Sequence, residues 1–391
     1  MTDAVLALNS GSSSTKFGLY EVGDAEPRLV LRGLLDLGDQ PRLSAKAADG
    51  TALVDRALAA DARGDAGFGE LLGWIEERLA GESLRAVGHR IVHGGGKFVV
   101  PTALDGYVIG ELDALTPLAP LHQPGSLRGV RAVARARPGL AQVGCFDTAF
   151  HRTIDATVAR VALPRRFEAE GVRRYGFHGL SYEYVAGRLA GISPALAAGR
   201  TVVAHLGNGA SLCAMQGGRS LDTTMGFSAL DGLVMGTRPG ATDPGVLLYL
   251  IREKRLSLEA LERLLYRESG LLGVSGISAD MRTLLASDDA SAREALDLFA
   301  FRAARETAAL AGTLGGLDCL VFTAGIGEHA APIRAMICDR LGWLGVELDA
   351  SANAAHAELI STPGSRVELR IIPTNEEIVI ARHTWAAVSE H

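Results

Sequence analysis

A short polar turn near the N-terminus carries residue types that bind phosphate. The segment LNSGSSSTKF, residues 8–17, places Asn9, four serines and Lys16 between two apolar runs. Backbone N–H groups, hydroxyls and an ammonium in one turn can form a nest for anionic oxygen atoms. The P-loop motif is absent, and an apolar strand rather than a helix follows the turn. The pattern predicts a β-hairpin over residues 5–20 whose turn cradles phosphate, or else an ordinary hairpin with a polar turn.

A second turn of the same kind lies about half a chain later. An apolar run at residues 202–206 leads into GNGAS at residues 207–211, and a further apolar run follows at residues 212–215. Two similar strand–turn–strand units indicate a duplicated domain. If the two turns face each other, they hold a nucleotide in the cleft between the copies.

Length, charge and cysteine content narrow the classes of function. The 391 residues carry a net charge of −6 and are 48% hydrophobic, which fits two globular domains. An acidic chain argues against nucleic-acid binding, which needs a basic surface. The four cysteines lack C-x-x-C spacing, so we expect buried, reduced thiols in a cytoplasmic protein, and no zinc site. No leader pattern and no apolar run of about 18 residues is present, so we expect no membrane partner.

Strands and helices must position these turns. We predict further strands at residues 28–37, 84–92, 142–146, 319–323 and 366–372. We predict helices at residues 68–79, 125–136, 182–189, 246–254, 257–267, 293–314, 331–341 and 378–388. Ser181 is expected to be the N-cap of the third helix. Residues 46–67, rich in Ala, Asp and Gly, are expected to form a surface excursion.

One of these strands ends in a glycine turn. The run CLVFT at residues 319–323 is followed by AGIGE at residues 324–328 and then by a predicted helix. Glycines allow close approach of a ligand, and a helix N-terminus favours negative charge. This order predicts a further part of a nucleotide site.

Ten segments, taken in order, resemble one family. They are LNSGSSSTKF (8–17), GHRIVHGG (88–95), PLAPLHQP (117–124), CFDTAFH (145–151), RRYGFHGLS (173–181), HLGNGASL (205–212), DTTMGF (222–227), MGTRPGATDPG (235–245), FTAGIGEHA (322–330) and PTNEEIVIAR (373–382). They span nearly the full length. On these motifs the chain resembles the acetokinase family, the acetate kinases.

The resemblance implies an α/β fold, the duplicated two-domain actin-like ATPase fold, with an interdomain nucleotide cleft. It places residues 1–149 and 378–391 in the first domain and residues 150–377 in the second. It implies reversible, direct in-line phosphoryl transfer from ATP to acetate, giving acetyl phosphate and ADP. It further implies Mg²⁺, with Mn²⁺ as an alternative, and a cytoplasmic homodimer.

Such a reaction needs positive charge near the phosphoryl group and alignment of the acetate with it. Acetate is already ionised at neutral pH, so no general base is required, and the obstacle is repulsion between two anions. By resemblance, Arg90 holds the acyl carboxylate, and Asp147 orients an arginine or the phosphoryl group. By the same resemblance, His178 and Arg238 stabilise the phosphoryl group during transfer. From the residues alone, Asp147 could also be a helix N-cap and His178 a structural turn histidine.

The resemblance also assigns binding residues. Asn9 and Glu376 lie on the metal side, and the neighbouring Glu377 stays open as an alternative. The acyl group is bound by Arg90, Val92, Leu121 and Phe177. The nucleotide is bound by Ser12, Ser14, Lys16, His205, Leu206, Gly207, Asn208, Gly209, Asp280, Met281, Arg282, Gly325, Ile326, Gly327, Glu328 and His329. Asp280 could instead be a helix cap.

Two positions depart from the family pattern. His329 stands where many members have Asn, and Ala229 stands where many have a Pro that walls the acyl methyl pocket. A smaller residue leaves room for one more methylene, worth about 0.8 kcal/mol of burial. The alternative function is therefore a kinase for propionate or another short-chain acid. A heat-shock-type ATPase would need a peptide-binding domain, and a sugar kinase would need a general-base Asp rather than two arginines.

Overall fold

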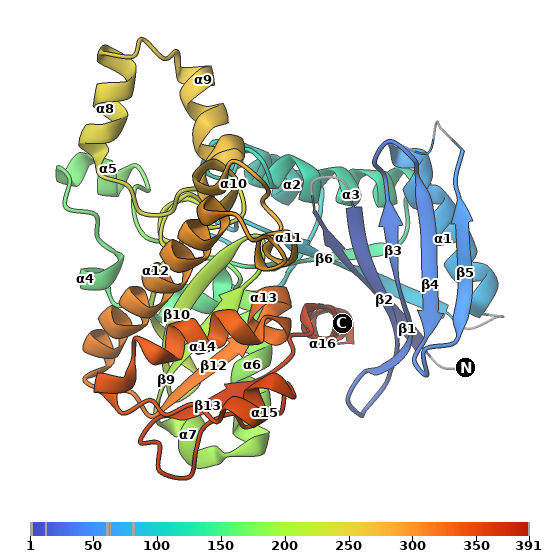
Figure 1. Cartoon of the computed structure of the whole chain (residues 1–391). Coiled ribbons are helices and arrows are strands. Elements are labelled where there is room, and N and C mark those ends of the chain that lie inside the picture. Colours follow the sequence, from blue (N-terminus) through green and yellow to red (C-terminus); the bar gives the residue numbers. More distant parts are fainter. Residues whose placement is uncertain (1–2, 12–13, 60–61, 63, 80–82, 390–391) are drawn as a thin grey trace. The chain divides into compact units, whose positions relative to one another are not determined.

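The computed structural model describes residues 3–11, 14–59, 62, 64–79 and 83–389. The chain divides into two compact units (Figure 1). The first unit comprises Met1–Phe150 and Asn375–His391, and the second comprises His151–Thr374. Each unit is built on one β-sheet with helices packed against it.

The sheet of the first unit begins with the predicted hairpin. Its strand order is β5-β4-β3-β2-β1-β6-β8-β7. The strands are β1 (Asp3–Ser10), β2 (Ser14–Val22), β3 (Arg28–Asp36), β4 (Arg42–Ala47), β5 (Ala52–Ala57), β6 (Ser83–Ile91), β7 (Thr102–Ala103) and β8 (Ala141–Phe146). Strand β1 pairs antiparallel with β2 and parallel with β6, and β6 pairs parallel with β8. The hairpin over residues 5–20 is thereby confirmed.

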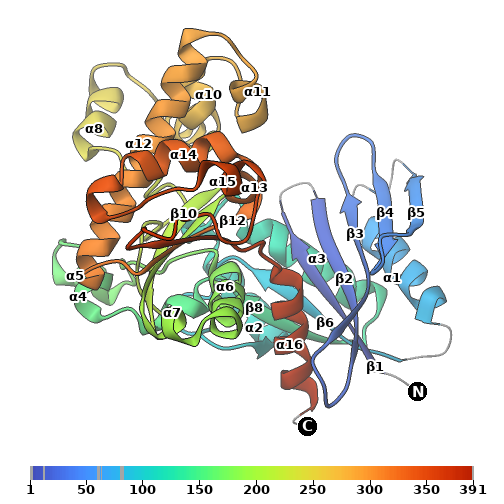
Figure 2. The same ribbon diagram turned by 60° about the horizontal axis from the view of Figure 1, so that its bottom comes forward.

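Helices cover both faces of this sheet. They are α1 (Asp65–Leu79), α2 (Gly106–Ala114), α3 (Gln123–Ala136) and α16 (Glu376–Ser389). Leu6 and Leu8 of β1 belong to one core with residues of α1 and α3. On the opposite face α16 runs across β1, β6 and β8 (Figure 2). Gly88 of β6 makes this approach possible, because a Cβ there would lie 2.0 Å from Thr384 Oγ1 of α16.

The sheet of the second unit repeats the same central pairing. Its order is β11-β10-β9-β12-β13. The strands are β9 (Arg200–Leu206), β10 (Ala210–Gln216), β11 (Arg219–Thr223), β12 (Cys319–Thr323) and β13 (Glu368–Ile371). Strand β9 pairs antiparallel with β10 and parallel with β12, as β1 does with β2 and β6. The second predicted hairpin is thus confirmed, and the two sheets share the arrangement that a duplication predicts.

Helices of the second unit account for most of its remaining length. They are α4 (Ala156–Ala159), α5 (Arg165–Ala169), α6 (Gly179–Ile192), α7 (Pro194–Ala198), α8 (Pro244–Arg252), α9 (Leu258–Arg263), α10 (Gly270–Ser275), α11 (Met281–Leu285), α12 (Ala290–Leu314), α13 (Ala324–His329), α14 (Ala331–Asp339) and α15 (Ala350–Ala354). The long helix α12 packs against β9, β10 and β11. Its buried residues recur at helical spacing, as the sequence predicts.

Two local predictions are wrong and one is incomplete. The described part of residues 46–67 lies mostly at the surface, as expected, but it also contains the end of β4, the edge strand β5 and the start of α1. Helix α6 begins earlier than predicted, so His178 rather than Ser181 is its N-cap. The glycine segment after β12 is itself the short helix α13 rather than a turn.

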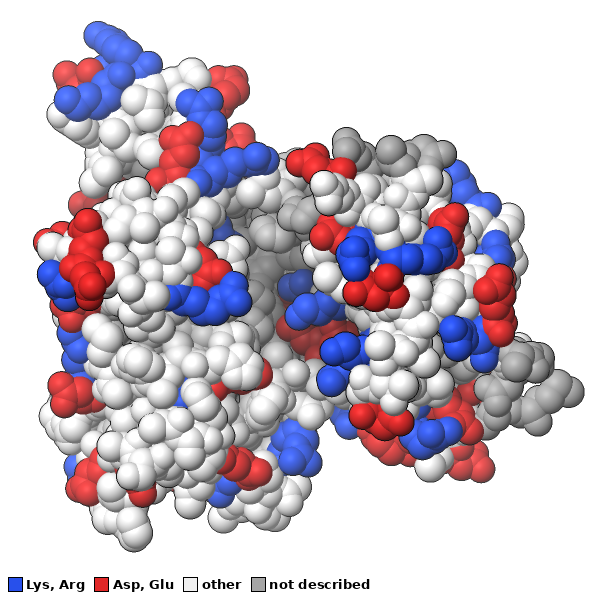
Figure 3. Space-filling model, turned by 45° about the vertical axis from the view of Figure 1, so that its right-hand side comes forward, with Lys and Arg blue, Asp and Glu red and all other residues white. Residues whose placement is uncertain are grey.

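Other predictions concern burial and surface. All four cysteines are buried thiols, as expected. In the described ranges, no helix has the length and apolar character needed to cross a membrane. Basic and acidic side chains lie next to one another on the face shown in Figure 3. Exposed pairs such as Arg42–Asp55 and Arg56–Glu70 join the two signs in the first unit.

Candidate functional site

In the first unit, four predicted site residues lie together at one end of the sheet. Arg90 is near the end of β6, Asp147 follows β8, Asn9 is near the end of β1, and Glu376 opens α16. Arg90 Nη2 lies 2.6 Å from Asp147 Oδ2, and Arg90 Nε lies 3.0 Å from Asp147 Oδ1. Arg90 Nη1 donates to Asn9 Oδ1 over 3.2 Å. Parallel strands end at a common edge, which is why residues far apart in the sequence meet here.

The Arg90–Asp147 pair is held in a nearly closed environment. Asp147 is fully buried, and the Arg90 side chain is 18% exposed. Burial alone would lower the pKa of Arg90, but the charges of Asp147 and Glu376 outweigh it and raise the pKa above its ordinary value. Arg90 is therefore permanently cationic, and its two-point contact with Asp147 fixes the plane of the guanidinium.

Asn9 connects this pair to two carboxylates. Its Nδ2 donates to Glu376 Oε2 over 2.7 Å and to Glu377 Oε1 over 3.1 Å. The sequence left Glu377 open, and the structure places it beside Glu376. Carboxylate and amide oxygens are ligands suited to Mg²⁺, which binds through one or two carboxylates together with substrate phosphates. Within the described ranges, no group of three or more His, Cys, Asp or Glu residues could hold a metal by itself.

The first polar turn is less open to a ligand than its composition indicates. Ser12 lies outside the described residues. Ser10 Oγ and Thr15 Oγ1 bond to each other over 3.0 Å, so both hydroxyls close the hairpin. Ser14 and Lys16 lie on β2, where Lys16 is exposed and is paired in register with Asn9.

The predicted residues of the acyl pocket are divided between the units. In the first unit Val92 is buried and Leu121 is half-buried. In the second unit Phe177 is buried next to His178, and its carbonyl accepts a hydrogen bond from His151 over 2.9 Å. Their common role in one pocket stays a prediction.

In the second unit, two predicted histidines form a stack. The rings of His178 and His205 lie 4.2 Å apart between centroids, with planes 12° from parallel. Each ring also contacts a serine through Nδ1, because Ser211 Oγ is 2.8 Å from His178 and Ser181 Oγ is 2.8 Å from His205. Both serines are fully buried. Sequence reasoning missed Ser211, and it assigned Ser181 to a helix cap.

Arg238 lies beside this stack. A Cβ on Gly209 would be 2.6 Å from Arg238 Nη2 and 3.5 Å from His178 Nε2, so the glycine is what lets both groups reach the turn. Arg238 is buried, and its Nη1 donates to the carbonyl of Ala229 over 2.7 Å. Within the described part of the chain, no carboxylate forms an ion pair with it, and burial lowers its pKa to about 10. An anion placed here would regain the interaction that burial has cost the guanidinium.

A cavity of about 520 Å³ contains half of the predicted nucleotide residues, a size typical of small-molecule sites. Its lining is Gly207, Asn208, Ala279, Asp280, Met281, Arg282, Leu285, Gly325, Ile326, His329, Ala330 and Pro332. Asp280 is also the N-cap of α11 and pairs with Arg282, so the alternative role foreseen for it is present as well. His205, Leu206, Gly209, Gly327 and Glu328 do not line this cavity.

One supporting residue of this cavity had no signal in the sequence. Arg334 of α14 is fully buried and donates to the carbonyls of Gly327 and Glu328 over 2.9 Å each. Burial lowers its pKa to about 10. It satisfies carbonyls at the end of α13 that have no partner within the helix. The carboxylate of Glu328 accepts from the backbone N–H of Thr374 over 3.1 Å. Gly327 and Glu328 therefore have structural contacts that position the cavity wall.

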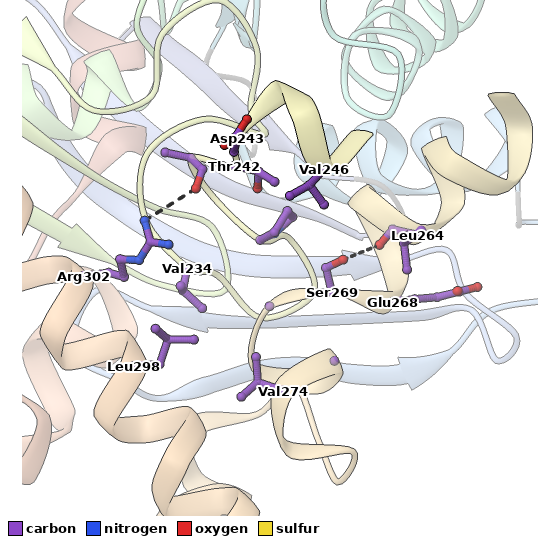
Figure 4. Close-up of a pocket in the computed structure, with 14 residues that line it drawn as sticks. Val234, Thr242, Asp243, Val246, Leu264, Glu268, Ser269, Val274, Leu298 and Arg302 are labelled. Carbon is purple, nitrogen blue, oxygen red and sulfur yellow. Dashed lines mark hydrogen bonds between the residues drawn. The ribbon is translucent and has the colours of Figure 1, made fainter. Parts of the chain in front are cut away.

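A second cavity of about 520 Å³ borders the loop that carries Arg238 (Figure 4). Its walls include Val234, Leu264 and Leu298, with Arg302 pointing toward the backbone of the loop. No predicted site residue lines it.

Solved structures define the class of protein. The crystal structure of a propionate kinase from Francisella tularensis matches with a TM-score of 0.90 and 35% identity, over 98% of this chain and 99% of that one. The crystal structure of Porphyromonas gingivalis acetate kinase matches with a TM-score of 0.84 and 35% identity, over 98% and 99% of the two chains. The fold and these matches define an α/β phosphotransferase of the actin-like ATPase type.

The sequence identifies the family within that class. The model of the Acetokinase family matches residues 4–382. An acetate kinase of Rhodopseudomonas palustris is 53% identical over 391 aligned residues, covering 98% of each chain. The chain belongs to the acetokinase family, as its motifs predict.

Proposed function

We propose that this protein transfers a phosphoryl group reversibly between ATP and acetate, giving acetyl phosphate and ADP by direct in-line transfer. The observation that carries this proposal is the buried Arg238 beside Gly209 and His178, a cation with no carboxylate partner in the described chain. Such a group stabilises an anion more strongly than an exposed or already paired arginine does. The names of its relatives support acetate as the acceptor.

Arg90 and Arg238 have different roles in this proposal. Arg90 has N–H groups left after its contacts with Asp147 and Asn9, and these can hold the acyl carboxylate. Asp147 orients that guanidinium rather than removing a proton, since acetate is already ionised. Arg238 and His178 meet the charge that develops on the transferring phosphoryl group.

Glu376 and Asn9 would hold Mg²⁺, with Glu377 as the neighbouring carboxylate, and Mn²⁺ is the alternative metal. The metal would supply neutralisation of phosphate charge. The cavity beside Asp280 and Gly325 would take the adenosine, and residues 205–209 together with Ser14 and Lys16 of β2 would bind the phosphates. The family resemblance supports a cytoplasmic homodimer. Sedimentation of the purified protein would test the dimer.

A propionate kinase is the second candidate. A neighbour described as a propionate kinase matches with a TM-score of 0.90. Ala229 is buried and is smaller than the proline expected there from the family pattern. Both candidates share the chemistry and differ by one methylene in the acyl pocket.

Hydroxylamine trapping tests the proposal directly. The purified chain, Mg²⁺ and ATP are incubated with formate, acetate, propionate or butyrate, and acyl hydroxamate is measured. We expect the largest yield with acetate, and the largest yield with propionate would select the second candidate. Absence of hydroxamate with every acid, under conditions where ADP formation is also absent, would overturn the proposed function.

A further inference from the structure

The ring of His178 is held by a buried chain of hydroxyls. His178 Nδ1 lies 2.8 Å from Ser211 Oγ, and the same oxygen lies 2.5 Å from the Tyr182 hydroxyl. Ser211 and Tyr182 are both fully buried. The backbone of His178 has φ of 57°, a left-handed conformation that is costly for a residue other than glycine. Strain of this kind persists where the surroundings impose it, and it often marks a functional residue.

The other ring nitrogen lies beside the phosphate turn. His178 Nε2 is 3.5 Å from the point that a Cβ on Gly209 would occupy, and Arg238 Nη2 is 2.6 Å from that point. A phosphoryl oxygen arriving next to Arg238 therefore meets the Nε2 side of the imidazole. A neutral histidine can donate from Nε2 only when its proton is there and Nδ1 accepts a hydrogen bond.

The hydroxyl chain can supply that hydrogen bond. If Tyr182 donates its proton to Ser211 Oγ, the Ser211 proton is left to donate to Nδ1 of His178. The reverse direction would put the histidine proton on Nδ1 and leave a lone pair facing the phosphoryl oxygen. Tyr182 thus sets the direction of the chain when its O–H donates to Ser211 Oγ, because the Ser211 hydrogen is then left for His178.

Several groups surround this ring. The imidazole of His205 on β9 stacks on it, and the guanidinium of Arg238 approaches from the loop after β11. The ring of His151 lies against Tyr182, with 5.6 Å between centroids. In a neutral ring, the position of the single proton decides which of the two nitrogens can donate.

We propose that Ser211 and Tyr182 are positioning residues that set the tautomer of His178 for phosphoryl transfer. Neither residue touches the substrate, and both act through the imidazole. The inference rests on the proposed function, because that function makes His178 a donor to the phosphoryl group.

Kinetics of two variants test the direction of the chain. Tyr182→Phe keeps the ring but removes the donor to Ser211, so kcat should fall about tenfold at about pH 8, the effect of one hydrogen bond. KM for ATP and acetate should stay close to wild type. Ser211→Ala removes the hydrogen-bond partner of Nδ1 itself, so its kcat should fall at least as far.

Thr307→Val is the matched control. Thr307 is a buried residue of α12 whose hydroxyl donates to the Ala303 carbonyl over 2.8 Å, and it lies outside the site. This variant also loses one buried hydroxyl, and its kcat should stay within about twofold of wild type. A Tyr182→Phe deficit that is absent, or that is no larger than the deficit of Thr307→Val, would overturn the proposal.

The tautomer can also be read without an activity assay. Long-range ¹H–¹⁵N NMR spectra of histidine-labelled protein distinguish a proton on Nε2 from one on Nδ1, and His178→Gln identifies the signal. We expect the Nε2–H form in wild type and a shift toward Nδ1–H in Tyr182→Phe. An unchanged ring signal would overturn the proposal. If wild type itself forms no acyl phosphate, the proposed function fails instead, and the two failures are thereby distinguished.

Discussion

Two arginines of the candidate site, one in each unit, are held in opposite ways. Arg90 is paired at two points with Asp147, and the carboxylate of Glu376 lies 3.9 Å away. Among the described residues, the Arg238 side chain hydrogen-bonds to the Ala229 carbonyl and to no carboxylate, and burial lowers its pKa, whereas the pKa of Arg90 is raised. The first guanidinium is already compensated in the free protein, and the second is not.

This difference suits Arg90 to orienting the acyl carboxylate and Arg238 to stabilising negative charge on the phosphoryl group. A compensated guanidinium keeps a fixed plane and gains modestly from a further anion, which suits a group that aligns the acyl carboxylate. An uncompensated one in a site of low dielectric gains strongly when negative charge develops next to it. We therefore expect the two arginines to respond differently to substitution, in stability as well as in rate.

The largest effect is expected from Arg238→Met. Removing the uncompensated cation should lower kcat at least about a hundredfold, the scale of one lost electrostatic donor in an active site. The free energy of unfolding should stay within about 1 kcal/mol of wild type, because a desolvated charge is replaced by an apolar chain of similar length. Steady-state kinetics and urea unfolding measure the two quantities. A rate within threefold of wild type would remove Arg238 from the site.

Asp147→Asn tests the compensated pair. The substitution keeps the shape but removes the charge opposite Arg90, so both activity and stability should fall. We expect a loss of about 2 kcal/mol in the free energy of unfolding, less than for a fully buried pair because the Arg90 side chain is partly exposed. The same urea titration applies. Equal stability changes in Asp147→Asn and Arg238→Met would show that the two arginines are not held differently.

The two hairpins show which features of the fold the sequence alone could predict. Two apolar runs around a Gly/Ser turn define each hairpin locally, so both were predicted and found. The hydrogen bonds made by the polar side chains of the turns could not be predicted in the same way. Mutual bonding of Ser10 and Thr15 depends on strand register, and composition alone could not show that these hydroxyls are used within the hairpin.

Contacts between distant segments were the part that could not be predicted. Tyr182 and Ser211 meet because α6 packs next to the β9–β10 hairpin. Both residue types are common, and their spacing in the sequence does not predict this contact. Arg334 had no motif at all, since a buried arginine that caps another helix has the same sequence appearance as an exposed one. The edge strand β5 was missed because exposure on both faces removes the apolar alternation.

The free energy of unfolding is expected to fall at acid pH because of two histidines in the first unit. His89, next to Arg90 on β6, is fully buried, and burial lowers its pKa to about 4, with the same direction for His93. The unfolded chain binds a proton near pH 6.5 and the folded chain does not, so stability is complete above that pH and falls between about pH 6.5 and about pH 4. Each histidine contributes a slope of about 1.4 kcal/mol per pH unit there.

His89→Gln removes one of these slopes. Urea unfolding between about pH 6.5 and pH 4.5 should show a shallower loss of stability than wild type, by about 1.4 kcal/mol per pH unit. Parallel curves for wild type and His89→Gln would show that His89 titrates normally in the folded protein.

The smallest expected effect comes from Ala229, the residue whose carbonyl holds Arg238. Ala229→Pro keeps that carbonyl and adds bulk where the family pattern has a proline, so kcat with acetate should change little. The ratio of kcat/KM for acetate to that for propionate should rise severalfold, because room for one methylene is worth about 0.8 kcal/mol. Wild type should discriminate by less than about tenfold, the low end for one methylene in an apolar pocket. A wild-type ratio above about two hundredfold, or no change on adding the proline, would show that Ala229 does not size the acyl pocket.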